Sequence, residues 1–366
     1  MNHHQVFISI RLIILIVVFI TCASSCAPKS LLPFADETPP LVQLPLSNAE
    51  IIDGRGRFRE IFCAILAKRG MRLPDYRPCQ EALVRVGKEP KGTGQSVDLG
   101  PTRQKLIALF VPGVGWDCIA DWLDMDDSIV KHLRQFGYDM QTIEVDGLSS
   151  TTNNARQIRN AIMEMEPVNP KPNFVLVGYS KGAPDILEAL VTYPEINQRI
   201  AAVVSVSGAI GGTPLADDTP QSLLALLRFW PEARCKEGDG GAIESLRPSV
   251  RKTWLAEHPL PKSIPYFSLV TYPKPDRISS ILNYSYKKLR QVDARNDSQL
   301  LVNDQLIPSS ILLGFANADH WALAVPIARS HPTIGVAFAD QNQYPREVMF
   351  EAVLRFIEEQ ITMAPR

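Results

Sequence analysis

The sequence predicts an α/β fold in which a mostly parallel sheet carries helices on both faces. Along residues 101–366, apolar runs of strand length alternate with segments whose apolar residues recur every three or four positions, the pattern of strands joined by crossover helices. One of these runs leads into a serine flanked by glycines and then into a helical segment. The 366 residues, 45% of them hydrophobic, are enough for one large domain with appended pieces.

The chain begins with a predicted targeting segment at residues 1–26. Arg11 precedes an unbroken apolar run at residues 12–20, and small residues follow. This run is shorter than the roughly 20 residues of a membrane-spanning helix, which favours a signal peptide over an uncleaved anchor. Residues 23–26 look like a bacterial lipobox without its usual leucine, so that Cys26 would be the lipidated first residue of an outer-membrane lipoprotein. Simple cleavage to a soluble periplasmic protein is the alternative.

Two segments separate the targeting sequence from the main domain. Residues 27–48 are rich in proline and predict a tether rather than a core element. Residues 49–100 predict a small helical segment packed on the main domain. Apolar side chains at intervals of three and four within residues 58–66 lie on one helix face, and a second short helix is expected at residues 80–86.

Six cysteines are present, and four of them lie beyond the targeting segment. An even set in an exported chain favours disulfides, and no CxxC or Cys/His spacing indicates a metal site. Three pairings are possible. We favour Cys63 with Cys79, which pins the helical segment, and Cys118 with Cys235, which ties the start of the main domain to a later insertion. Free buried thiols are the alternative.

The main domain is expected to contain six strands, at residues 106–111, 140–145, 174–177, 201–206, 266–271 and 311–315. Helices are expected between them at residues 119–136, 154–165, 183–193 and 278–289, and Thr151, Thr152 and Asn153 offer caps for the second of these. Parallel strands joined by right-handed crossovers place a functional site at the carboxyl ends of the strands.

The glycine-flanked serine is Ser180, in the motif of residues 178–182 (Gly-Tyr-Ser-Lys-Gly). Small residues are needed on both sides because the turn from strand to helix brings backbone close to backbone and strains the serine. The hydroxyl would then stand at a helix N-terminus, where free N–H groups favour an oxyanion. The strand before and the helix after favour a nucleophile over an ordinary tight turn.

With this motif the chain resembles the α/β-hydrolase superfamily, and within it the bacterial lipases and esterases, over residues 101–360. The resemblance implies that residues 112–114 (Pro-Gly-Val) form an oxyanion loop, with proline where lipases carry histidine. The backbone N–H groups of Val114 and Lys181 would be the two donors, and an ordinary glycine turn is the alternative for the loop. The Lys181 side chain is expected to be solvated.

The resemblance also implies a mobile lid at residues 214–262. Apolar residues crowd positions 223–230 and would cover an acyl site from there. A plain core cluster is the alternative interpretation of these residues.

The family order is serine, acid, histidine, and it identifies His320 as the base. His320 follows the strand expected at residues 311–315, in the loop where the family places its histidine. Five other histidines are unsuitable by position, because they lie in the targeting segment, precede any suitable acid, or open no loop: His3, His4, His132, His258 and His331.

Asp297 is the favoured acid. It stands in Asn-Asp-Ser, which resembles the Asn-Asp-Gly of several lipases with a serine in place of the glycine, and it lies well ahead of His320. Asp304 is the alternative, although it leaves little chain before the strand at residue 311. Asp319 adjoins the histidine, and sequence neighbours rarely face one another well enough to pair.

These residues predict a serine hydrolase that cleaves carboxylic esters of a small molecule or a lipid, without a cofactor or a metal. An acyltransferase or thioesterase with the same three residues, and a non-catalytic binding module of the cell envelope, are the alternatives. The formal net charge is -1 and no basic run is present, which excludes nucleic-acid binding. Association with a membrane is expected only through the lipid anchor.

Overall fold

The computed structural model describes residues 51–123, 126–166, 173–220, 222, 226–229, 233 and 235–363. They belong to one compact unit, Pro39–Arg366. The expected targeting segment with Cys26 and the expected tether lie outside the described residues, as do residues 223–225 and 230–232 of the expected lid. No helix in the described ranges has both the length and the apolar character needed to cross a membrane.

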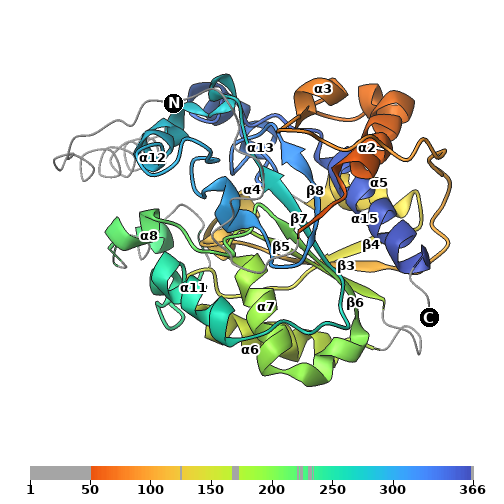
Figure 1. Cartoon of the computed structure of the whole chain (residues 1–366). Helices are drawn as coiled ribbons and strands as arrows, with labels where there is room; N and C mark the ends of the chain where they lie inside the picture. The colour runs from red at the N-terminus through yellow and green to blue at the C-terminus, as the bar shows by residue number, and fades with distance from the viewer. Residues whose placement is uncertain are drawn as a thin grey trace. The chain divides into compact units, whose positions relative to one another are not determined.

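Eight strands among the described residues form one sheet (Figure 1). They are β1 (Ile52–Asp53), β2 (Leu83–Val84), β3 (Ile107–Val111), β4 (Asp139–Thr142), β5 (Phe174–Tyr179), β6 (Ile200–Val206), β7 (Tyr266–Thr271) and β8 (Ile311–Ala316). Their order is β1-β8-β7-β6-β5-β3-β4 with every neighbouring pair parallel, and β2 pairs antiparallel with β8. The mostly parallel sheet predicted from the sequence is confirmed.

The helices surround this sheet. They are α2 (Arg55–Arg69), α3 (Cys79–Ala82), α4 (Trp116–Leu123), α5 (Asp126–Arg134), α6 (Thr151–Glu164), α7 (Gly182–Thr192), α8 (Leu215–Asp218), α10 (Ala242–Ser245), α11 (Pro248–Glu257), α12 (Asn283–Leu289), α13 (Ile327–Ser330), α14 (Pro332–Ala337) and α15 (Arg346–Met363). Short 3-10 helices are η2 (Gly70–Arg72), η3 (Pro194–Arg199), η4 (Leu226–Phe229), η5 (Pro275–Arg277), η6 (Ser280–Leu282) and η7 (Val302–Gln305).

Helices cover both faces of the sheet, as predicted. On one face α15 packs against α2 and α5, and on the other α6 packs against α7 (Figure 1). Successive residues of a strand point to opposite faces, and on β3 Phe110 joins the core under α15 while Leu109 joins the core under α7. All six residues of β5 are buried, which explains why this central strand has an unbroken apolar sequence.

The segment before the main domain differs from the prediction. Its long helix, α2, buries the expected apolar face, including Phe58 and Phe62. The helix expected at residues 80–86, however, is wrong beyond Ala82, because Leu83 and Val84 form strand β2 and pair with β8. Together with β1, this segment therefore adds two short strands to the edge of the sheet.

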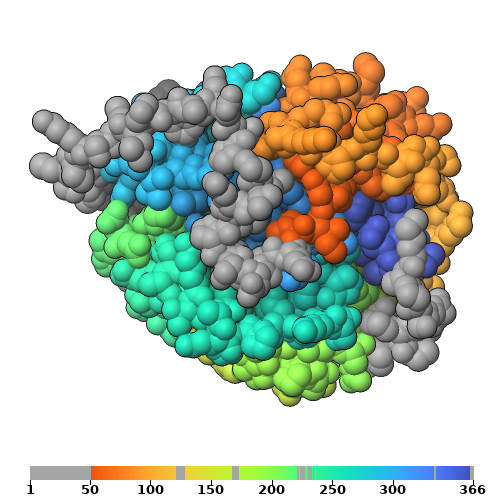
Figure 2. Space-filling view, viewed as in Figure 1, coloured from red at the N-terminus to blue at the C-terminus, as the bar shows by residue number. Residues whose placement is uncertain are grey.

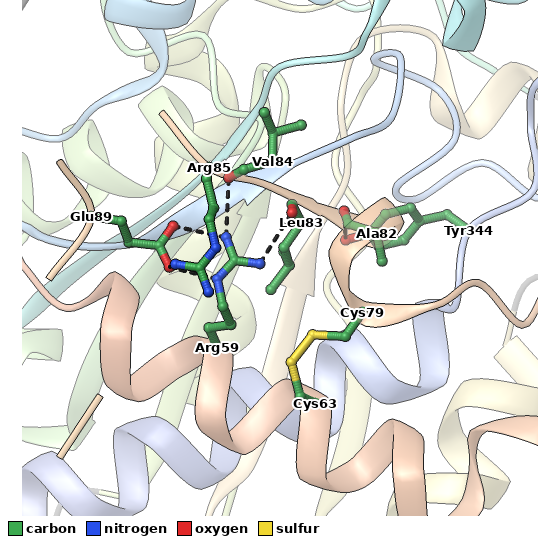
Figure 3. The surroundings of a disulfide bond; sticks show 9 residues. All are labelled: Arg59, Cys63, Cys79, Ala82, Leu83, Val84, Arg85, Glu89 and Tyr344. Carbon is green, nitrogen blue, oxygen red and sulfur yellow. Dashed lines mark hydrogen bonds and ion pairs between the residues drawn. A yellow bond between two sulfur atoms is a disulfide. The ribbon is translucent and has the colours of Figure 1, made fainter. Parts of the chain in front are cut away.

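Both favoured disulfides are present. Cys63 of α2 is bonded to Cys79 of α3 (Figure 3), and Cys118 of α4 is bonded to Cys235. Near the first of them, Arg59 donates hydrogen bonds to the carbonyl oxygens of β2 and forms an ion pair with Glu89 (Figure 3). A disulfide that closes a loop of this length contributes about 3 kcal/mol by the loop-entropy argument. The covalent bond and the arginine together hold α2 against β2.

Helix α6 starts earlier than predicted. Its cap is Ser150, whose hydroxyl accepts a hydrogen bond from the N–H of Asn153 at 3.1 Å, so the expected cap residues Thr151, Thr152 and Asn153 already belong to the first turn. A serine at this position satisfies an amide that has no partner within the helix. The helix expected at residues 119–136 corresponds to α4 and α5, and residues 124–125 between them lie outside the described residues.

Candidate active site

Ser180 occupies the sharp turn between β5 and α7. Its φ angle is 53°, in the left-handed region that strains a residue with a side chain. A Cβ atom at Gly182 would lie 2.0 Å from the carbonyl oxygen of Val111, and one at Gly178 would lie 2.4 Å from the Cα atom of Ala183. Glycine is therefore required on both sides of the serine, for the reason given by the sequence pattern.

The structure brings Ser180, His320 and Asp297 together at the carboxyl ends of the strands. Nε2 of His320 lies 2.9 Å from Oγ of Ser180, and Nδ1 lies 2.8 Å from Oδ2 of Asp297. A carboxylate can only accept, so Nδ1 carries a proton and Nε2 is left to accept the serine proton. His320 is 4% exposed and Asp297 is fully buried.

Both carboxylate oxygens of Asp297 have several donors. Oδ1 accepts hydrogen bonds from the N–H groups of Gln299 and Leu300, at 2.9 and 2.7 Å. Oδ2 accepts from the hydroxyls of Ser207 and Thr271, at 2.7 and 2.5 Å, in addition to the histidine. The two amides belong to the turn that follows Asp297, so the local chain itself orients the carboxylate.

These contacts keep Asp297 ionised. Burial acts to raise the pKa of Asp297, but the charge and hydrogen bond of His320, with the hydroxyls of Thr271 and Ser207, hold that pKa below its ordinary value. The carboxylate is therefore available as a negative partner for a protonated histidine.

The alternative acid lies elsewhere. Asp304 is in η7, where its carboxylate lies 3.5 Å from Nζ of Lys252 and its backbone carbonyl accepts from Gly211. Burial raises the pKa of Asp304 to about 6, against the opposing effect of Lys252. Among the described residues the structure does not bring Asp304 into hydrogen-bonding contact with His320.

Asp319 does not pair with its neighbour His320 either. Its carboxylate accepts hydrogen bonds from the backbone N–H groups of Ser279 and Ala322, both at 2.9 Å. It thereby supports the loop that carries the histidine.

The loop after β3 passes directly over Ser180. A Cβ atom at Gly113 would lie 2.7 Å from Cβ and 3.2 Å from Oγ of Ser180. Within the described part of the chain, neither the N–H of Val114 nor that of Lys181 has a hydrogen-bond acceptor. Both amides are therefore free to donate to an added oxyanion.

The expected solvated side chain at Lys181 is wrong. This lysine is 1% exposed, and its Nζ lies 2.8 and 2.9 Å from the two carboxylate oxygens of Asp185, one turn further along α7. Asn154 of α6 donates to the same carboxylate at 2.8 Å. Positions i and i+4 meet on a helix, and a buried charge requires such a partner.

Three residues around the histidine were not singled out from the sequence. Tyr179 donates its hydroxyl to the carbonyl oxygen of His320 at 2.8 Å, and its ring centroid lies 5.2 Å from that of the imidazole. Ser207 and Thr271 donate to Asp297 from the carboxyl ends of β6 and β7. The rule that these strand ends meet at one edge of the sheet would have identified Ser207 and Thr271.

Ser298 stands where the related lipase motif has glycine, and we expect this serine to lower the free energy of unfolding. Its φ angle is 83°, it is fully buried, and its hydroxyl has no hydrogen-bond partner in the described structure. Ser298→Gly is expected to raise the free energy of unfolding by about 1 kcal/mol, because relief of backbone strain and of a buried hydroxyl exceeds the added chain entropy. Urea unfolding measures this change.

Ser309 provides a matched control. It also has a positive φ angle, 60°, but it is exposed, so Ser309→Gly relieves only the backbone strain. The gain at Ser298 should exceed the gain at Ser309. A Ser298→Gly protein that is less stable than the parent would contradict this account.

The insertion expected as a lid reaches the loop after β3. A Cβ atom at Gly115 would lie 2.6 Å from Cδ1 of Leu227, whereas Phe229 is 70% exposed. Lys288 of α12 forms a 3.0 Å ion pair with Asp218 of α8. In Figure 2 the green surface around α8 adjoins the blue surface around α12. Movement of this insertion stays a prediction.

No protein-family model matches the sequence, and no curated protein matches it. Among solved structures, the metagenomic carboxyl esterase MGS0156 is 35% identical to this chain with a TM-score of 0.80, over 94% of this chain and 99% of the esterase. The mature lipase BlEst2 of Bacillus licheniformis shares the fold at 20% identity and a TM-score of 0.50, over 67% of this chain and 95% of the lipase. The chain therefore belongs to the α/β-hydrolase superfamily.

Proposed function

We propose that this chain is a serine hydrolase that cleaves carboxylic esters, with Ser180 as nucleophile, His320 as general base and Asp297 as the acid that orients it. The observation that carries the proposal is the unbroken series of hydrogen bonds from Ser180 through both ring nitrogens of His320 to Asp297. A serine hydroxyl is a weak nucleophile unless an oriented base takes its proton. Similarity to a carboxyl esterase supports carboxylic esters as the substrate class.

In the proposed reaction, Oγ of Ser180 attacks the ester carbonyl carbon while its proton passes to Nε2 of His320. The N–H groups of Val114 and Lys181 donate to the resulting oxyanion. His320 then gives the proton to the leaving alcohol and later takes one from the water that hydrolyses the acyl-enzyme. Asp297 stays ionised throughout, in keeping with its lowered pKa.

Apolar side chains beside the oxyanion loop support a substrate with an apolar acyl or alcohol group. Val114 packs against a cluster that consists of Ala209, Ala216, Ile243, Leu246 and Leu300. The cluster begins next to the nucleophile, because the N–H of Ala209 donates to the carbonyl oxygen of Ser180 at 2.9 Å. Small-molecule and lipid esters both fit this description.

Two disulfides support the proposed export to an oxidising compartment.

Labelling by a fluorophosphonate probe, with hydrolysis of a series of p-nitrophenyl esters, tests the proposal. The wild-type protein is expected to be labelled and to hydrolyse the esters, and Ser180→Ala is expected to lose both properties while it stays folded. Faster transfer to an added alcohol than to water would identify an acyltransferase, and preference for a thioester of the same acyl group would identify a thioesterase. A folded wild-type protein that reacts with neither probe nor ester would overturn the proposal and favour a binding module.

A further inference from the structure

A cluster of buried hydroxyl groups lies behind the acid that orients the histidine. Oγ of Ser207 lies 2.7 Å from Oδ2 of Asp297, 2.7 Å from Oγ1 of Thr271 and 2.9 Å from Nδ1 of His320. Ser207 and Thr271 are both fully buried. We propose that Ser207, supported by Thr271, is a positioning residue that holds the side chains of Asp297 and His320 in their relative orientation. This inference rests on the proposed function.

The arrangement of protons supports this role. Ser207 and Thr271 have one hydroxyl proton each. The Thr271 proton can point at Oδ2 of Asp297, at Oγ of Ser207 or at Oε1 of Gln305, 3.0 Å away, whereas the Ser207 proton can point at Oδ2 of Asp297 or at Oγ1 of Thr271. When Ser207 donates to Oδ2, the carboxylate has a hydroxyl donor wherever the Thr271 proton points. The oxygen of Ser207 also lies close enough to Nδ1 of His320 to be a second acceptor for its N–H. When the histidine takes the proton of Ser180, its Nδ1–H therefore faces a carboxylate and a hydroxyl dipole.

The backbone of Ser207 is held in an unfavourable conformation at this place. Its φ angle is 49°, and its N–H donates to the carbonyl oxygen of Leu269 at 2.9 Å, which continues the pairing of β6 with β7. Glycine would adopt this conformation without strain but would remove the hydroxyl. Backbone strain at the edge of a site indicates a functional constraint. Here the strained serine provides a hydroxyl that an unstrained glycine would lack.

The supporting threonine is itself fixed by a side-chain amide. Gln305 accepts the N–H of Thr271 at 2.7 Å and donates to its carbonyl oxygen at 3.1 Å. Through these two hydrogen bonds the side-chain amide of Gln305 pairs with the backbone at the end of β7, as a neighbouring strand would, and fixes it. Thr271 therefore presents its hydroxyl to Ser207 and Asp297 from a rigid position.

Strand β7 offers a matched control. Ser268 is also fully buried, and its hydroxyl lies 3.0 Å from the N–H of Ile307 and 2.9 Å from Oγ of Ser310. Ser268→Ala therefore removes a buried, hydrogen-bonded hydroxyl of the same kind without touching Asp297 or His320.

The test measures kcat and KM for a p-nitrophenyl ester with the full chain, and thermal unfolding reports folding. Ser207→Ala is expected to lower kcat by about 10- to 100-fold, the range known for outer hydrogen-bond partners that orient the histidines of metal sites, with KM within about twofold. Ser268→Ala should keep kcat within about twofold. Ser207→Gly, which relieves the φ strain but also lacks the hydroxyl, should lose as much as Ser207→Ala.

A double-mutant cycle separates positioning from structure. Added to Asp297→Asn, Ser207→Ala should lower kcat no further, because both effects of Ser207, on the carboxylate and on the Nδ1–H that the carboxylate fixes, require Asp297. A Ser207→Ala protein as active as Ser268→Ala, activity restored by Ser207→Gly, or an additive loss in the Asp297→Asn background would each overturn the inference while wild-type labelling still supports the proposed function. An unreactive wild-type protein would overturn both.

Discussion

Asp297→Asn is expected to lower kcat/KM for a chromogenic ester by about 10⁴-fold, the size known for the same change in the Ser-His-Asp triad of serine proteases. The asparagine amide would donate to Nδ1 of His320, whereas in the parent protein Nδ1–H donates to Oδ2 of Asp297. The ring proton would then move to Nε2, where it faces Ser180 and prevents the histidine from acting as a base. Steady-state kinetics at pH 8 measure the loss.

Asp304→Asn is the matched control, since it changes the other aspartate that follows an asparagine. Its carboxylate contacts Lys252 rather than His320, and kcat/KM should stay within about twofold of the parent value. If the two substitutions exchanged their effects, Asp304 would be the acid and the observed hydrogen-bond geometry would not be the reactive one. Equal losses would instead indicate a general effect on folding, which thermal unfolding would reveal.

The choice between Asp297 and Asp304 depends on a contact that the sequence pattern alone does not reveal. Both follow an asparagine in the stretch between β7 and β8, so pattern alone left them as alternatives. The fold distinguishes the two positions, because the N–H of His320 donates to the carbonyl oxygen of Asp297 at 2.9 Å and joins the two loops directly. A contact of this kind depends on the order of strands in the sheet. The pattern did predict the loops that carry Ser180 and His320, since each directly follows a long apolar strand.

Other differences have equally local causes. Strands β1 and β2 have two residues each, too few for any periodic signal, and they are strands only because β8 offers a free edge. The buried ion pair could have been predicted, because Lys181 and Asp185 stand four residues apart where the chain enters the helix expected at residues 183–193.

Lys181→Met is expected to lower the free energy of unfolding by about 3–5 kcal/mol, the cost of removing one partner of a buried ion pair. The change leaves Asp185 fully buried without its cationic partner, while the Asn154 amide still donates to it. Urea unfolding at pH 8 measures the loss. Arg103→Met, which breaks the exposed ion pair of Arg103 with Asp98, should change stability by less than about 1 kcal/mol.

The cause of that loss can be tested by neutralising the remaining charge. In Lys181→Met/Asp185→Asn no unpaired buried carboxylate is left at this position, and the new amide can donate to Oδ1 of Asn154, which otherwise has no partner in the described structure. Most of the lost stability should therefore return. A double variant no more stable than Lys181→Met would show that packing of the lysine stem, rather than charge, is responsible.

The pH dependence gives the same test without a second substitution. Burial raises the pKa of Asp185 even beside Lys181, and removal of the lysine should raise that pKa further. A carboxyl whose pKa is higher in the folded than in the unfolded state binds its proton more tightly when folded, so stability rises as the pH falls through the folded pKa. The deficit of Lys181→Met relative to the parent should therefore shrink between pH 8 and pH 5. If the stability difference between Lys181→Met and the parent stays constant over this range, Asp185 remains ionised or is reached by water in the variant. The ion pair would then not be what stabilises the start of α7 beside Ser180.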